Sequence, residues 1–115
     1  MADQTAQLIQ ELTPWARYHA IELINAARIE LGLPAVITSA KRNLEQQKEL
    51  LRTGRTRTLQ SKHLLGQAFD VDMYGYNRDQ VPAYVYQALG ELGERFGLTW
   101  GGRFVSFRDV GHFEL

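Results

Sequence analysis

Apolar residues recur mostly at intervals of three and four along the first third of the chain, which is the spacing of an amphipathic helix. Thr13 and Pro14 form a typical helix start, with the threonine as N-cap, and a Gly-Leu-Pro sequence at 32–34 ends the pattern. We therefore predict a helix over residues 14–31. The apolar positions that define this pattern are Leu8, Leu12, Trp15, Tyr18, Ile21, Ile24, Ala27, Ile29 and Leu31.

Two further segments have the same helical spacing of apolar residues. The pattern predicts helices over 44–53 and over 79–96, the second capped by the aspartate at its first position. Pro82 would lie in the first turn of this last helix. Gly90 and Gly93 lower its helix propensity, and we interpret them as a sign of close packing against a sheet.

Alternation of period two marks the strands. Residues 35–39 are a short β-branched run, and in residues 68–73 three apolar side chains alternate with an alanine and two aspartates. The segments 98–100, 104–107 and 111–115 follow, with a Gly-Gly turn after the first, and they predict an antiparallel hairpin whose last strand is C-terminal. Helices and strands together indicate an α+β fold.

Length and composition limit the classes of protein that remain. A chain of 115 residues predicts one domain, 1–115, with a helical part at about 1–33 and a catalytic core at about 35–115. The hydrophobic content of 44% and charged content of 23% are typical of soluble globular proteins. Thirteen basic and 13 acidic residues give zero net charge, which argues against nucleic acid as a partner. Without cysteine, no disulfide or thiolate metal site can form.

Two polar segments, one in the middle of the chain and one at its C-terminus, carry the candidate chemistry. His63, Asp70 and His112 can be read as two nitrogen ligands and one oxygen ligand of a zinc ion, with a fourth position left for water. On one continuous strand His63 and Asp70 would face opposite sides, so they converge only if the chain turns at Gly66. From this stretch alone, a solvated strand face with an incidental histidine is an equally good interpretation.

Other polar residues are less clearly marked by the pattern. Asp109 lies three residues before His112 with a bend-permitting glycine between them, and it would be free to act as a base. On the last strand, His112 and Glu114 would share one face. Arg42 follows a strand and precedes a helix, a common place for a functional side chain, although its position alone favours a solvated arginine. His19, alone on a helix, is interpreted as structural or solvated.

These motifs, in this order, resemble a known family. They are S-x-H-x-x-G-x-A-x-D at 61–70, W-G-G at 100–102 and D-x-x-H-F-E at 109–114. The pattern is similar to the zinc D-Ala-D-Ala carboxypeptidase or VanY-like peptidases, peptidase family M15, and most similar to the L-alanyl-D-glutamate endopeptidases found as phage endolysins. The resemblance covers roughly 36–115 and includes an S-x-x-R…Q…G-R-T segment at 39–56.

The resemblance implies a role for each matching residue. His63, Asp70 and His112 match the zinc ligands, Asp109 matches the catalytic acid and base, and Arg42 matches an arginine that polarises the substrate carbonyl. It also implies that three further motif residues contact the substrate or lie behind the ligands: Ser61, Gln47 and Trp100. The implied fold is a small α+β domain of the hedgehog and D,D-peptidase type, with helices packed on a mostly antiparallel sheet.

The function implied by the resemblance is zinc-dependent cleavage of the peptidoglycan stem peptide. An aspartate at position 109 favours an L-alanyl-D-glutamate endopeptidase, because the carboxypeptidase and dipeptidase branches usually carry glutamate there. A D,D-carboxypeptidase or dipeptidase of cell-wall metabolism remains a second interpretation. A non-catalytic binding module is a third, although the intact ligand set argues against it. Phe104 and Gly111 depart from the family pattern, where tryptophan and, in many endolysins, proline are frequent.

The sequence and the resemblance also give expectations about the location and partners of the protein. The N-terminus lacks a basic start followed by an apolar run, so no secretory signal is expected. No apolar run of 18 residues is present, so no insertion into a membrane is expected. An endolysin of this kind would be a monomer in the host cytoplasm and would reach the cell wall after release by a holin-type partner.

Overall fold

A four-stranded antiparallel sheet with the order β1-β2-β4-β3 is the centre of the fold. The protein is represented by a computed structural model, which describes residues 2–41, 44–54 and 62–115. The strands are β1 (Ala35–Ser39), β2 (Ala68–Met73), β3 (Thr99–Trp100) and β4 (His112–Glu114). The strands predicted at 35–39 and 68–73 are therefore confirmed, and β2 and β4 form the middle of the sheet.

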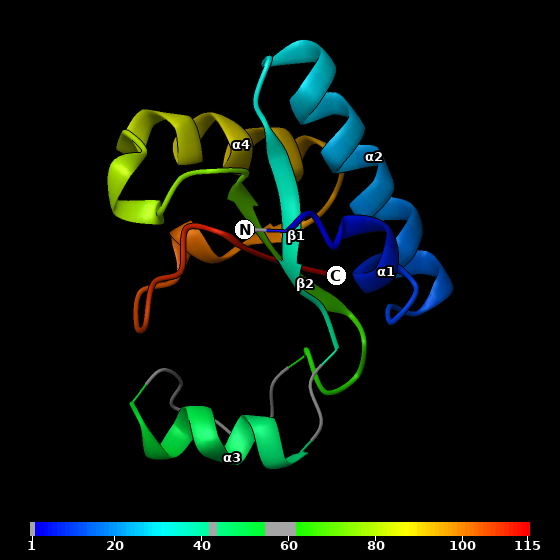
Figure 1. Ribbon diagram of the computed structural model, residues 1–115, viewed down its shortest axis with the longest axis vertical. Helices are drawn as coiled ribbons and strands as arrows, with labels where there is room; N and C mark the ends of the chain where they lie inside the picture. Colours follow the sequence, from blue (N-terminus) through cyan, green and yellow to red (C-terminus); the bar gives the residue numbers. More distant parts are fainter. Residues whose placement is uncertain (1, 42–43, 55–61) are drawn as a thin grey trace.

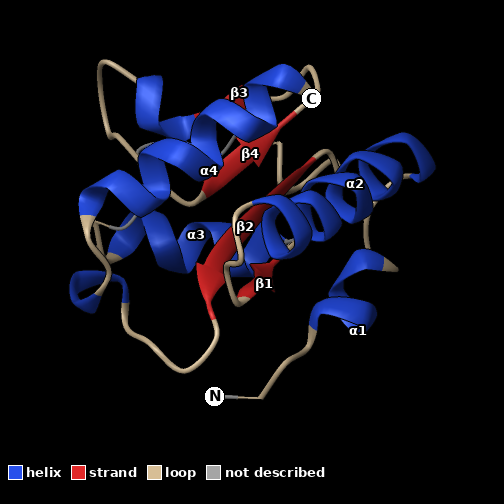
Figure 2. Cartoon of the chain, turned by 90° about the horizontal axis from the view of Figure 1, so that it is seen from above, coloured by secondary structure: helices blue, strands red, loops and turns tan. Residues whose placement is uncertain are grey.

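Helices lie on both sides of this sheet (Figures 1 and 2). α2 and α4 pack against each other and against the strands on one side, and α3 lies on the other side, beyond the ends of the strands. The helical elements are α1 (Thr5–Ile9), α2 (Pro14–Glu30), α3 (Leu44–Arg52), the 3-10 turn η1 (Arg78–Gln80), α4 (Ala83–Arg95) and the 3-10 turn η2 (Gly101–Arg103). This arrangement confirms the predicted α+β fold. None of the helices in the described part of the chain is long and apolar enough to cross a bilayer.

The core lies between the sheet and the α2–α4 layer. Alternate side chains of β2 point into this core, as the period-two pattern predicts. A methyl group on Gly90 would lie 2.2 Å from the Trp100 ring, and one on Gly93 would lie 2.5 Å from the Phe113 ring. The two glycines therefore allow α4 to approach the sheet closely, which confirms the interpretation of their positions. The largest fully buried side chains include Phe69, Val71, Leu23, Leu89, Leu92, Trp100 and Phe113.

Only some of the apolar positions in the N-terminal pattern are buried in α2. The predicted helix at 14–31 is confirmed, but Trp15 and Tyr18 are 64% and 54% exposed, and Ile29 is 82% exposed. Residues before Thr13 form the separate helix α1 rather than a continuation of the same stripe. Small side chains let α2 lie close to the core, which larger apolar residues would prevent. The buried positions are Ala16, His19, Ala20, Leu23, Ile24 and Ala27.

The predicted helix at 79–96 was wrong at its start. The chain forms η1 first, and α4 begins only at Ala83, with Pro82 as its N-cap rather than inside its first turn. The reason is local, because the residue before a proline is disfavoured in the helical region. Val81 is accordingly extended, with φ −102° and ψ 126°. As a consequence, Arg78 lies in a short turn beside the sheet.

The predicted strand at 104–107 is also wrong. After β3, the Gly-Gly sequence forms η2 instead of a hairpin turn, and the chain continues as irregular structure to β4. Phe107 adopts φ +52°, a left-handed conformation that a strand cannot contain. The antiparallel pairing of the last two strands is confirmed, with Thr99 opposite Glu114. The connection between them is therefore a long loop, and Asp109 lies in it.

Candidate metal centre

The three predicted ligands come from three segments that meet at the middle of the sheet. Asp70 on β2 lies directly opposite His112 on β4, so the two side chains share one face of neighbouring strands. His63 lies in the segment before β2. The chain turns back at Gly66, with φ +67° and a hydrogen bond from its N–H to the His63 carbonyl. This turn places His63 beside Asp70, as predicted.

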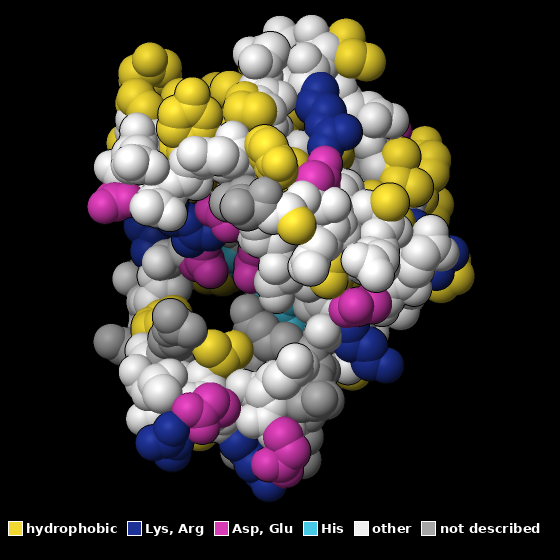
Figure 3. All heavy atoms as spheres, viewed as in Figure 1, with side chains coloured by type: hydrophobic (Ala, Val, Ile, Leu, Met, Phe, Trp, Pro, Cys, Tyr) yellow, Lys and Arg dark blue, Asp and Glu magenta, His cyan; other side chains and the backbone are white. Residues whose placement is uncertain are grey.

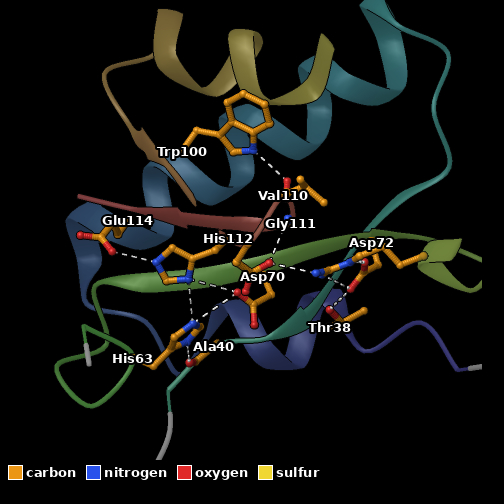
Figure 4. A network of polar contacts seen from close by, with 12 residues as sticks. Thr38, Ala40, His63, Asp70, Asp72, Trp100, Val110, Gly111, His112 and Glu114 are labelled. Atoms are coloured by element: carbon orange, nitrogen blue, oxygen red, sulfur yellow. Dashed lines mark hydrogen bonds and ion pairs between the residues drawn. The ribbon is translucent and has the colours of Figure 1, made fainter. Parts of the chain in front are cut away.

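The three ligand atoms form a nearly equilateral triangle (Figure 4). His63 Nε2 lies 3.2 Å from His112 Nδ1, and each of these nitrogens lies 3.3 Å from Asp70 Oδ1. Donor atoms that lie about 2.0 to 2.1 Å from a tetrahedral zinc ion are about 3.3 to 3.4 Å from one another. All three residues are buried. The donor set and its spacing therefore fit one tetrahedral cation with three protein ligands.

In both histidines, the ring nitrogen that points away from the triangle has a hydrogen-bonding partner. This partner leaves the other ring nitrogen available as a ligand. His63 Nδ1 donates a hydrogen bond to the Ala40 carbonyl, 2.5 Å away, so its Nε2 can carry a lone pair. His112 Nε2 lies 2.8 Å from Glu114 Oε1, which leaves Nδ1 for the centre of the triangle. Lys62 Nζ lies 3.4 Å from the other oxygen of Glu114. Such partners orient histidine ligands and raise their basicity.

The charges of the site favour its ionised carboxylate. Burial alone would raise the pKa of Asp70, but its hydrogen bonds to His112 and His63 outweigh burial and hold that pKa well below the usual range. Burial disfavours the imidazolium of His112, but its contacts with Asp70 and Glu114 dominate and raise the pKa of His112. The site therefore attracts positive charge, whether a proton or a metal cation.

Asp109, the predicted base, lies in the loop before β4, three residues ahead of His112. The backbone N–H of His112 donates to the Asp109 carbonyl at 3.3 Å, so the loop curls back onto the strand that carries the ligand. Asp109 Oδ1 accepts hydrogen bonds from the Gly111 N–H at 3.1 Å and from Arg78 Nη1 at 2.9 Å. Asp109 is thus a second carboxylate near the cluster that is not itself one of the three ligands.

Two residues of this site were missed or undervalued in the sequence. Glu114 was expected to share a face with His112, and its hydrogen bond to that histidine was not anticipated. Arg78 was not singled out at all, because it belongs to no periodic pattern and lies just before the helix predicted at 79–96. The sequence signal that existed was Pro82, which prevents a helix from beginning at residue 79.

A cleft of about 730 Å³ leads to the triangle. It lies between the edge of the sheet at β1 and the helix α3, and Figure 3 shows the molecule hollowed there, with histidine and acidic side chains on the wall. Asp70 contributes to its inner surface, so the cleft gives access to the ligand cluster. The other lining residues are Leu8, Glu11, Thr38, Ser39, Ala40, Lys41, Glu45, Gln46, Glu49 and Leu50.

The remaining predicted site residues stand as follows. Arg42 and Ser61 lie outside the described residues, and Gln47 lies in α3 without a described side chain. Trp100 is buried, and its Nε1 donates to the Val110 carbonyl at 2.7 Å. The sequence predicted that Trp100 either contacts the substrate or lies behind the ligands. This hydrogen bond fits the second role, because it anchors the segment between Asp109 and His112.

Comparison with known proteins gives the family. The sequence model described as D-alanyl-D-alanine carboxypeptidase, a group of M15 peptidases, matches residues 54–115, which is more than half of the chain. The chain belongs to this family. It is 28% identical over 123 residues to the L-alanyl-D-glutamate peptidase of Listeria phage A118, covering all of this chain but only 38% of that protein. It is 27% identical to the Bacillus subtilis endopeptidase CwlK, covering 91% of this chain and 74% of that protein.

Solved structures show the same fold. The Serratia marcescens L-Ala D-Glu endopeptidase ChiX superposes with a TM-score of 0.69 at 22% identity, covering 100% of this chain and 88% of that one. The vancomycin resistance D,D-pentapeptidase VanY, in complex with Zn(II), superposes with a TM-score of 0.67 at 20% identity, covering 90% and 71%. The α+β architecture found here is therefore shared with both an endopeptidase and a D,D-peptidase.

Proposed function

We propose that the protein is a zinc-dependent peptidoglycan peptidase that cleaves the stem peptide between L-alanine and D-glutamate. The observation that carries this proposal is the triangle of His63, Asp70 and His112, whose donor atoms are 3.2 to 3.3 Å apart at the end of a cleft. Three protein ligands leave one position open, which is the ligand count of a catalytic zinc site. Both curated relatives carry the name of an L-alanyl-D-glutamate peptidase.

The chain's own residues would divide the work of peptide hydrolysis. His63, Asp70 and His112 would hold a zinc ion, which would supply a Lewis acid and lower the pKa of a bound water molecule to about 7. Asp109 would accept the proton of the attacking water and return it to the leaving amine. Arg42, as predicted from the sequence, would stabilise the negative charge on the carbonyl oxygen.

A D,D-carboxypeptidase is the second candidate. It is favoured by the description of the family and by the likeness to VanY. The two activities use the same ligand set and differ in the bond that the cleft places at the metal. The sequence favours the endopeptidase through Asp109, where the resemblance implies glutamate for the carboxypeptidase branch.

Product analysis of digested peptidoglycan separates these candidates. Purified protein is incubated with sacculi and with soluble stem peptides, and the products are identified by mass spectrometry and by labelling of new N-termini. An endopeptidase releases peptides that begin with glutamate, whereas a carboxypeptidase releases free alanine. Protein treated with a chelator, and the same protein after zinc is restored, provide the control. Absence of both products from the zinc-loaded protein would overturn the proposed function.

We further propose a role outside the cell that makes the protein. The likeness to a phage peptidase fits a monomer that is produced in the host cytoplasm and reaches the wall after a holin-type partner opens the membrane. Lysis of cells only when such a partner is co-expressed would support this role. Lysis by the protein alone at the same level of expression would contradict it.

A further inference from the structure

A guanidinium group joins two carboxylates beside the metal centre. Arg78 in η1 binds Asp72 through Nε at 2.9 Å and Nη2 at 3.3 Å, and its Nη1 donates to Asp109 Oδ1 at 2.9 Å. Asp72 lies on the same face of β2 as Asp70, two residues further along the strand. Arg78 therefore connects the strand that carries one proposed ligand to the loop that carries the proposed base.

The Asp72 end of this connection is fixed by the scaffold. Asp72 also accepts hydrogen bonds from Thr38 Oγ1 on β1 at 2.8 Å and from Tyr86 Oη on α4 at 2.9 Å. The guanidinium carbon of Arg78 lies 5.6 Å from the centre of the Tyr86 ring, within the range of a cation–π contact. Arg78 is thus held by a carboxylate and an aromatic ring, with one N–H group left to point at Asp109.

The Asp109 end is held at one oxygen only. Oδ1 accepts from both Arg78 Nη1 and the Gly111 N–H. Among the described residues, Oδ2 of Asp109 has no hydrogen-bonding partner. Gly111 also leaves the space that Arg78 occupies, because a methyl group there would lie 2.3 Å from Arg78 Nη2. The carboxylate is therefore oriented at Oδ1, and Oδ2 is left to exchange protons.

We propose that Arg78 is the positioning residue of the base, which holds Asp109 by Oδ1 so that Oδ2 is presented to the reacting water. This inference rests on the proposed function, because it assigns a role within the same site. A carboxylate on a long loop loses rotational freedom when two donors grip one of its oxygens. Effective catalysis depends on such alignment, which the supporting residues have to provide.

The main test replaces Arg78 and measures kcat and KM separately with soluble stem peptide as substrate. In Arg78→Ala we expect kcat to fall about a hundredfold, the effect of misplacing a catalytic group by about 1 Å, while KM and zinc content change little. Arg78→Lys should recover only part of the rate, because an ammonium group cannot bind Asp72 by a fork and reach Asp109 as well. Crystal structures of the wild type and Arg78→Ala should show Asp109 displaced only in the variant.

Arg103 provides a matched control for the loss of an arginine. It makes the same kind of fork to Glu94, at 3.1 and 3.0 Å, and lies 5.2 Å from the Trp100 ring. Among the described residues, no hydrogen bond or ion pair joins it to Asp109. Arg103→Ala should therefore cost similar stability while leaving kcat within about twofold, since surface ion pairs contribute little.

A double variant separates positioning from general support of the fold. If Arg78 acts through Asp109, then Arg78→Ala should slow Asp109→Ala no further, because residues that act as a unit are not additive. An equal loss of kcat in both backgrounds, or full activity of Arg78→Ala with Asp109 unmoved in the crystal, would overturn the inference. A wild-type protein without peptidase activity would instead overturn the proposed function, which is a different result.

Discussion

Asp70 and Asp72 occupy the same face of β2, yet they belong to two regions with different chemistry. Asp70 meets two imidazole nitrogens that can carry lone pairs, and the three donors converge on one point. Asp72 meets a guanidinium and two hydroxyl groups, all of which donate hydrogen bonds to it. A guanidinium has no lone pair to offer a cation. The metal centre therefore ends at Asp70, and Asp72 serves the scaffold.

The difference shows that the neighbours of a carboxylate decide its function. Both aspartates alternate with core residues in the same strand, so their backbone positions are equivalent. Their neighbours in the folded chain differ. Asp70 lies opposite His112 in the sheet, whereas the segment after β2 brings Arg78 to Asp72. The following variants test this division between a cation-binding cluster and a cluster already neutralised by an arginine.

The largest expected effect is at the ligands. His63→Ala should lose bound zinc and reduce peptidase activity to the background rate, because two ligands cannot hold the metal in the same geometry. Elemental analysis and turnover of the purified variant provide the measurement. His19→Gln is the control, since His19 belongs to α2, outside the cluster, and its Nδ1 lies 3.0 Å from the Trp15 carbonyl oxygen. Full zinc content in His63→Ala would disprove the ligand assignment.

The second largest effect is expected at Asp109, the proposed base. Asp109→Asn should lower kcat by about a hundredfold to ten-thousandfold, the usual contribution of a general base, with zinc still bound. The amide keeps the shape of the side chain and can still accept from Arg78 and Gly111 through its oxygen. Single-turnover kinetics and metal analysis check this prediction. Loss of zinc together with activity would mean that Asp109 is a ligand.

A smaller effect is expected behind the ligands. Glu114→Gln should weaken zinc binding by about tenfold to hundredfold, as is typical when the carboxylate partner of a histidine ligand is lost. With saturating zinc, turnover should return close to that of the wild type. Competition with a chromogenic chelator measures the affinity. An unchanged affinity would indicate that the 2.8 Å contact with His112 contributes nothing to metal binding.

The smallest effect is expected in the scaffold cluster. Tyr86→Phe removes the hydroxyl that donates to Asp72 but keeps the ring beside Arg78. We expect the free energy of unfolding to fall by about 1 kcal/mol, the net value of one hydrogen bond, with zinc affinity unchanged. Denaturant unfolding monitored by fluorescence provides the measurement. A change in zinc affinity instead would mean that the two clusters are not independent.

The sequence predicted that His63, Asp70 and His112 come together, because this geometry follows from local rules. Period-two alternation fixed the face of Asp70, and the glycine at 66 indicated the turn that returns His63 to that face. Arg78 could not be predicted in this way. Its contact with Asp109 joins side chains 31 positions apart and depends on η1, which forms where the helical pattern predicted the start of a longer helix.

The helical segments teach a related lesson about the fold. The location of α3, the close packing at Gly90 and Gly93 and every predicted strand except the one at 104–107 were predictable, since each depends on spacing within one segment. The buried face of α2 was not, because the packing surface selects alanines over the larger Trp15 and Tyr18. Burial of a helix face is decided by the shape of its partner as well as by hydrophobicity.

The pairing of Asp70 with His112 across β2 and β4 has a consequence for how the sheet unfolds locally. A cation held there would fasten the two middle strands to each other and, through His63, close a loop between residues 49 positions apart. Separating these strands would then require release of the metal, as in other proteins whose folding is coupled to a ligand. Amide hydrogens of β2 and β4 should exchange with solvent deuterium only through global unfolding in the zinc-loaded protein, whereas those of α3 should exchange through local fraying.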